Sequence, residues 1–99
     1  MIISTSSLRT RNAFEYFNEL RTHFAKRVPV DAAQTMARVT LPIGTCDLAA
    51  SGTDISARIE ANPDHVDRME EVFGGWIERI AFRENAKLTW QRATLPTKD

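Results

Sequence analysis

Residues 36–60, MARVTLPIGTCDLAASGTDISARIE, decide the fold of this chain. Three short runs in this stretch alternate apolar residues with mostly polar ones, which is typical of half-buried antiparallel strands. The runs are separated by Pro42-Ile43-Gly44 and by Ser51-Gly52-Thr53-Asp54, whose residue types favour hairpin turns. The predicted inward residues are Ala37, Val39, Leu41, Cys46, Leu48, Ala50, Ile55, Ala57 and Ile59.

An amphipathic helix is expected on each side of these strands. Before them, apolar residues recur at spacings of four, three and four, with Thr10 as the expected N-cap and Pro29 as the stop. After them, Asn62-Pro63-Asp64 supplies a cap, a first-turn proline and a first-turn acid, which predicts a helix start. The two stripes are Ala13, Phe17, Leu20 and Phe24, and then Val66, Met69, Phe73, Trp76, Ile77 and Ile80.

Two weaker strands complete the pattern at the ends of the chain. Residues 2–8 predict an edge strand, and residues 86–92 predict a last strand with Leu88 and Trp90 inward. The order is β-α-β-β-β-α-β in a single domain over residues 1–93, followed by a frayed tail at 94–99. We therefore expect an α+β two-layer sandwich, with a mainly antiparallel sheet and two helices on one face.

Composition narrows the class of protein. A chain of 99 residues with 42% hydrophobic and 26% charged residues is neither disordered nor collagen-like. The 13 basic and 13 acidic residues give a formal net charge of +0, so neither nucleic acid nor a membrane surface is expected as a partner. A single cysteine and the absence of a signal-like or membrane-length apolar stretch predict a cytoplasmic protein. Because so short a chain builds a thin core, a homodimer through the sheet is a further expectation.

The polar sheet face carries the sharpest binding hypothesis. Arg38 and Arg58 are both outward by parity, and two guanidinium groups on one surface suit a carboxylate or a phosphate. The alternative is a solvated or dimer-forming face, with ion pairs from either arginine to Asp47 or Glu60. The outward set holds no aromatic residue for base stacking, which argues against an RNA-binding sheet. Three further polar residues are expected beside the arginines: Thr40, Thr89 and Gln91.

His23 and Lys26, near the end of the first helix, form a second candidate site. A histidine has an ordinary pKa near working pH and so suits a general base, but the position of His23 beside Phe24 near a helix end favours a capping or packing role. Cys46 points inward by parity, which favours a small buried hydrophobe over a nucleophile. His23, Cys46, Asp47 and His65 have no ligand spacing, so we expect no metal and no cofactor.

Gly74-Gly75 is the oddest local feature, because two glycines inside a helix cost roughly 2 kcal/mol relative to alanines. A kink, a close packing contact or a ligand against the bare backbone would offset that cost. Trp76 follows directly, and a pocket wall there is one interpretation.

Three short segments of the sequence resemble those of a known protein family. They are HFAK at 23–26 leading to VPV at 28–30, GTC at 44–46, and ERIAFRE at 78–84 before Trp90. Together they resemble a small bacterial domain family of unknown function, found alone or joined to siderophore-interacting flavoproteins, over about residues 5–91. The resemblance implies a setting in iron–siderophore handling but no catalytic residues. Members often carry histidine where this chain has Trp76, so the chain departs from them there.

These observations favour a non-enzymatic accessory or binding domain with a small anionic ligand near Arg38 and Arg58. The catalytic motifs that can be recognised by spacing are absent from the sequence. One alternative is a small enzyme with a site around His23 and Lys26. The other is a docking module for a flavoprotein partner, which predicts an exposed apolar patch that includes Met36.

Overall fold

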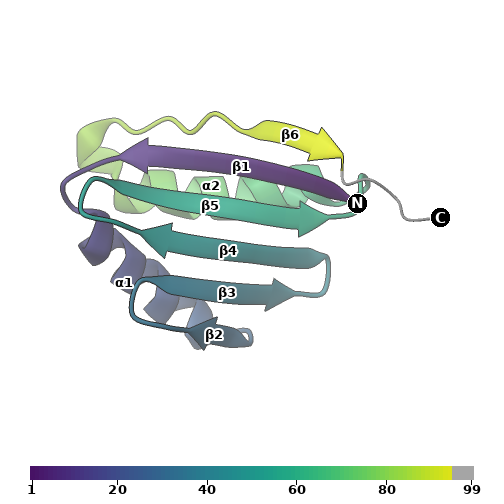
Figure 1. Cartoon of the computed structure of the whole chain (residues 1–99), viewed down its shortest axis with the longest axis horizontal. Coiled ribbons are helices and arrows are strands. Elements are labelled where there is room, and N and C mark those ends of the chain that lie inside the picture. Colours follow the sequence, from purple (N-terminus) through teal and green to yellow (C-terminus); the bar gives the residue numbers. More distant parts are fainter. Residues whose placement is uncertain (95–99) are drawn as a thin grey trace.

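The structure, a computed structural model, describes residues 1–94 and shows a six-stranded antiparallel sheet with two helices on one face (Figure 1). This confirms the predicted α+β sandwich. The strands lie in the order β2-β3-β4-β5-β1-β6. Within the described residues, no helix is long and apolar enough to cross a membrane. The elements are β1 (Ile2–Arg9), α1 (Ala13–Ala25), β2 (Val30–Ala32), β3 (Met36–Leu41), β4 (Gly44–Ala50), β5 (Asp54–Ala61), α2 (Val66–Ile80), the 3-10 helix η1 (Phe82–Glu84) and β6 (Gln91–Thr94).

The three central strands follow the predicted alternation. Val39, Cys46 and Ile59 lie opposite one another across β3, β4 and β5, and none of the three is accessible to solvent. The helices cover this row from one side, and the rings of Phe24 in α1 and Phe73 in α2 meet at 4.9 Å between centroids. One continuous core therefore lies between the sheet and the helices, as the two apolar stripes require.

Both helices start differently from the prediction. No side chain caps α1 or α2. The Thr10 hydroxyl accepts a hydrogen bond from the Asn12 amide at 3.1 Å, just before α1, and donates one to Glu84 at 2.9 Å. At α2 the Asn62 backbone carbonyl, rather than its side chain, accepts the amides of His65 and Val66. The residues around Pro63 form a turn of their own, so the helix begins at Val66.

The sheet gains one strand that sequence reasoning missed, and its last strand is shifted. The predicted edge strand at residues 2–8 is instead the interior strand β1, because β6 pairs on its outer side. The missed strand is β2, which pairs with β3. It is only three residues long, and so short a segment shows no recognisable alternation of apolar and polar residues. The predicted strand at 86–92 is wrong over 86–90, because β6 begins at Gln91 and pairs with β1 only along Ile2–Thr5. Figure 1 shows the segment before β6 running beside β1 as an irregular ribbon. Of the tail predicted to be frayed, Thr94 ends β6 and the rest lies outside the described residues.

The irregular segment 86–90 is anchored to α2 instead of to β1. The Leu88 amide donates to the Glu78 carboxylate at 2.9 Å. The Trp90 indole lies so close to Gly74 that a Cβ at this glycine would be 3.1 Å from the indole nitrogen. Helix α2 continues through both glycines, so close packing accounts for Gly74, whereas Gly75 faces open space.

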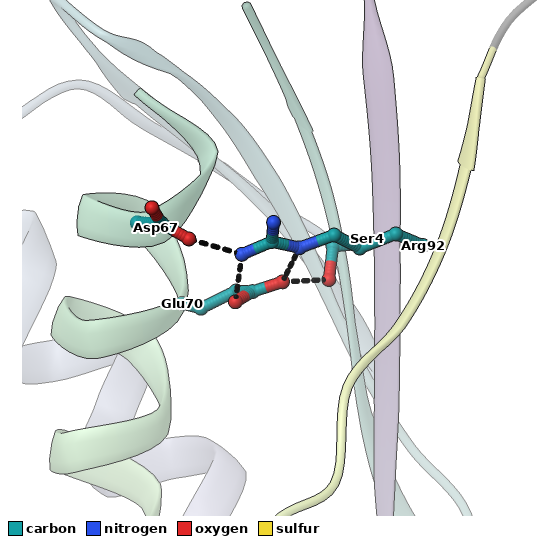
Figure 2. A network of polar contacts seen from close by, with 4 residues as sticks. All are labelled: Ser4, Asp67, Glu70 and Arg92. Atoms are coloured by element: carbon teal, nitrogen blue, oxygen red, sulfur yellow. Dashed lines mark hydrogen bonds and ion pairs between the residues drawn. The ribbon is translucent and has the colours of Figure 1, made fainter. Parts of the chain in front are cut away.

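A polar cluster joins β6 to the same helix (Figure 2). Arg92 reaches from β6 and binds both carboxylate oxygens of Glu70, at 2.7 and 2.8 Å, and also the carboxylate of Asp67. The buried Ser4 hydroxyl on β1 donates to Glu70 at 2.5 Å. Hydrogen bonds from Arg92, and then from Ser4, lower the pKa of Glu70 from its ordinary value. The β6 edge is thus held by side chains as well as by backbone pairing.

Candidate functional site

A row of polar side chains crosses the outer sheet face, opposite the helices. Its members lie opposite one another on successive strands, because the antiparallel register aligns them. Charge alternates along the first four positions and is absent from the last two. In strand order the row is Asp31, Arg38, Asp47, Arg58, Thr5 and Gln91.

The two predicted arginines share this face but not one site. They are separated by β4, whose Asp47 lies between them. Arg38 binds both oxygens of Asp47, at 2.7 and 3.1 Å, and this hydrogen bonding lowers the pKa of the Asp47 carboxyl. Arg58 instead donates from one nitrogen, Nη1, to Glu60 at 2.6 Å. The cross-strand pair of Arg38 with Asp47 confirms one predicted ion pair, and Arg58 keeps a second terminal nitrogen for other partners.

A hollow of about 390 Å³ lies beside Arg58, between β1, β5 and the irregular segment; we call it the β1 hollow. The backbone around Ser6 and Ala57 also contributes to its lining. It forms where the pairing of β1 with β6 stops, after Thr5. Its remaining lining residues are Thr5, Ser7, Ser56, Arg58, Lys87, Thr89 and Gln91.

The irregular segment supplies two of these side chains, Lys87 and Thr89. Its side chains alternate: Ala86, Leu88 and Trp90 turn toward the core, while the residues between them stay exposed. The predicted alternation is therefore present, although the segment is not a strand. Lys87 and Thr89 therefore both line the β1 hollow. The anchors at Leu88 and Trp90 fix the backbone that carries them, which limits the ordering cost of binding a ligand.

The electrostatics of the β1 hollow favour an anion. Arg58 and Lys87 bring two positive charges, and the ion pair of Arg58 with Glu60, which lies outside the lining, offsets part of the first. The other lining residues are neutral, and no carboxylate side chain among residues 1–94 lines the hollow. Lys87 forms no ion pair with any described residue. Two cations with neutral donors around them match the needs of a carboxylate or a phosphate.

His23 and Lys26 lie on the other layer of the molecule, on α1. Together with Arg27 they line a shallow hollow of about 500 Å³. The His23 ring stacks on Trp76, with 3.8 Å between ring centroids. Burial, and then the charges of Arg27, Lys26 and Arg79, lower the pKa of His23, which favours the neutral form of the ring. The imidazole forms no hydrogen bond with a described residue that would orient it as a base, and packing on Trp76 is its visible role.

Cys46 lies within the core, as its parity predicts. Its thiol is inaccessible to solvent, and burial raises its pKa far above the ordinary value. A buried thiol of this kind is a poor nucleophile. Among residues 1–94, no three His, Cys, Asp or Glu side chains converge as metal ligands.

The four predicted site residues thus fall into separate places. Arg58 lies at the β1 hollow and pairs with Glu60, Arg38 pairs with Asp47 away from the hollow, and His23 and Lys26 lie on the helix layer. Sequence reasoning placed Thr89 and Gln91 beside Arg58, and both line the hollow. It missed Lys87 as a site residue, although the period-two pattern at 86–91 already turned this lysine outward. No sequence signal pointed to Thr5 or Ser7, because their place depends on the strand order.

Comparisons with known proteins agree on the fold and the family. The NMR structure of PA4090 from Pseudomonas aeruginosa is similar, with a TM-score of 0.78 and 25% sequence identity, over 92% of this chain and 96% of that chain. No curated protein matches the chain. The model of a family described as uncharacterized protein conserved in bacteria, DUF2218, matches residues 5–91. This match spans most of the chain, which therefore belongs to the bacterial family DUF2218.

Proposed function

We propose that this domain is a non-enzymatic binding module that holds a small carboxylate-bearing anion in the β1 hollow. One observation carries the proposal: Arg58 and Lys87, from distant parts of the chain, line the same hollow with neutral hydrogen-bonding side chains and no described carboxylate. The volume of about 390 Å³ lies within the range of about 300–1,000 Å³ that small-molecule sites occupy.

The chemistry of the lining selects a multivalent anion. The free guanidinium nitrogen of Arg58 and the ammonium of Lys87 each suit one carboxylate, and a hydrogen bond to a charged group contributes roughly 1.5–3 kcal/mol. The hydroxyl groups of Ser7, Ser56 and Thr89 suit further ligand oxygens. A hydroxylated di- or tricarboxylate uses all of these groups at once.

The iron–siderophore setting enters here as part of the proposal. It rests on the resemblance of the sequence segments to domains joined to siderophore-interacting flavoproteins. Carboxylate-bearing iron chelators are the anions that this setting would supply, and citrate is the simplest probe of that class. In this proposal the domain binds the chelator and leaves any redox step on the iron to a partner.

Isothermal titration calorimetry with citrate at low salt tests the proposal. Arg58→Gln and Lys87→Gln should each weaken binding about tenfold or more, since each removes one charge-assisted contact. Arg38→Gln is the matched control, because Arg38 lies on the same face and contacts Asp47 instead of the hollow. It should leave the affinity within about twofold. Equal losses in all three variants would mean general surface attraction, and no binding by the wild type would refute the proposal.

Docking onto a flavoprotein partner, or onto a second copy of the chain, is the second candidate. Met36 favours it, because this residue is 56% exposed on the outer face beside a shallow hollow that Asp31 and Arg38 also line. Met36→Lys would abolish such docking and leave citrate binding unchanged, so sedimentation and calorimetry on this one variant separate the two functions.

A further inference from the structure

A second hollow, of about 500 Å³, lies on the helix layer between α1 and the end of α2; we call it the interhelical groove. Its acidic wall is Glu15 and Glu19, which a spacing of four places on one face of α1. Its basic wall is Arg79 in the last turn of α2 and Arg83 in η1. With Glu84, the lining holds three carboxylates and two guanidinium groups, so it carries both signs of charge, unlike the β1 hollow, which is lined only by positive charge.

None of the four charged side chains in the two walls forms an ion pair with a described residue, although the guanidinium groups of Arg79 and Arg83 lie over the rings of Trp76 and Phe82. The ion pairs of the described residues all involve other side chains, and none of the four appears in a side-chain hydrogen bond within residues 1–94. Glu84, at the end of the groove, is already occupied, because it accepts hydrogen bonds from Thr10, Asn12 and Tyr16. Opposed charges that line one hollow without pairing are available to a ligand with two opposite charges of its own.

The groove also offers a fixed aromatic surface. Trp76 lies in its lining, and its ring contacts His23 at 3.8 Å between centroids and the Arg79 guanidinium at 5.1 Å. Phe82 lines the same groove and is 65% exposed, which leaves much of a large apolar side chain in contact with water. An apolar or aromatic group of a ligand would cover Phe82 and pack against Trp76.

We propose that the interhelical groove binds a small zwitterion with a large apolar side chain, namely a free aromatic amino acid or a short peptide of that type. The α-ammonium group lies against Glu15 and Glu19, and the α-carboxylate lies against Arg79 and Arg83. The side chain packs on Trp76 and Phe82. This site is separate from the β1 hollow and does not depend on the anion proposed there.

A nuclear magnetic resonance titration with three related probes tests this site. L-Phenylalanine has both charges, N-acetyl-L-phenylalanine lacks the ammonium, and L-phenylalanine methyl ester lacks the carboxylate. The free amino acid should bind with a dissociation constant on the order of 1 mM, and each modified probe about tenfold more weakly. The indole resonance of Trp76 should shift and saturate, while that of Trp90, which packs on Gly74 outside the groove, should stay in place.

Exposed variants then assign the two charged walls. Arg83→Gln should weaken the binding of L-phenylalanine about tenfold. It should leave the affinity for the methyl ester unchanged, because the ester has no carboxylate that could contact Arg83. Glu15→Gln should weaken L-phenylalanine and the methyl ester but leave the N-acetyl probe unchanged. Arg68→Gln, a change at an exposed position of α2 outside the groove, is the control and should change nothing.

Three results would overturn the site. The first is no saturable shift of the Trp76 indole with L-phenylalanine. The second is equal affinity for all three probes, which would mean an apolar contact only. The third is saturation by a long amphipathic peptide but by none of the three small probes, which would make the groove a protein-docking surface.

Discussion

The two edges of the sheet are built in different ways. At the β2 edge, the short strand β2 pairs with β3 over three residues, Val30–Ala32. At the β6 edge, β6 pairs with β1 over four residues, and side chains also anchor the chain to α2: Arg92 on Glu70, the Leu88 amide on Glu78, and Trp90 on Gly74. A hollow opens at the second edge, because side-chain anchors leave a gap beside β1 that a continued ladder would close.

The same difference separates the two arginines of the outer face. Arg38 lies among fully paired strands, where the register presents it directly to Asp47. Arg58 lies next to β1, where its far neighbour is the neutral Thr5 and then the gap. Binding capacity on this face therefore follows from where the backbone ladder ends, and not from the number of arginines.

The largest expected loss of stability comes from a core substitution that should weaken both edges of the sheet equally. Phe73 is fully buried and stacks on Phe24 beneath the middle of the sheet, so Phe73→Ala should lower the free energy of unfolding by about 3–5 kcal/mol. Urea unfolding measures the loss, and amide hydrogen exchange should show it equally at β3 and at β1. A loss of protection confined to one edge would mean that the core is not continuous.

A substitution at Gly74 should cause a smaller loss of stability, confined to the β6 edge. Gly74→Val would crowd the Trp90 indole, because a Cβ at this position already lies 3.1 Å from the indole nitrogen. Overpacking of this kind lowers the free energy of unfolding by about 1–3 kcal/mol. Hydrogen exchange should rise in segment 86–94, and citrate affinity should fall with it because Lys87 and Thr89 move. Gly75→Val is the matched control and should stay within about 0.5 kcal/mol of the wild type, because nothing lies within 4 Å of its Cβ. Equal costs at the two glycines would show that Trp90 does not anchor the segment.

The smallest effect concerns acid stability at the same edge. Arg92 lowers the pKa of Glu70, so the unfolded chain binds more protons than the fold once the pH drops below the ordinary pKa of 4.5. The stabilisation is thus present at neutral pH and is lost as the pH falls through the lowered pKa. Arg92→Gln should make the protein less stable near about pH 7 and flatten its loss of stability toward about pH 3. Parallel pH profiles for the two proteins, from urea unfolding, would contradict the assignment.

The sequence was most informative where backbone pairing is complete. The alternation at 36–60 predicted the three central strands and the inward place of Cys46, because period two directly reports a buried face. The same reasoning failed at 86–90, where the parity of Leu88 and Trp90 is right but the partner is α2 instead of β1. Parity says which side chains turn inward, and it does not say what they pack against.

The candidate site was predictable only in part for the same reason. Arg58 could be placed on the outer face from its neighbours in sequence, together with Thr89 and Gln91. The gap that makes it a binding residue depends on β1 lying between β5 and β6 and on pairing that ends at Thr5. Both are tertiary facts that no local pattern contains.

Mapping citrate onto the backbone amides by nuclear magnetic resonance tests most directly whether the β1 hollow binds an anion. We expect saturable shifts confined to residues 5–7, 56–58 and 87–91, which surround the hollow. Shifts centred on His23, Lys26 and Arg27, or spread over all basic surfaces, would contradict this expectation.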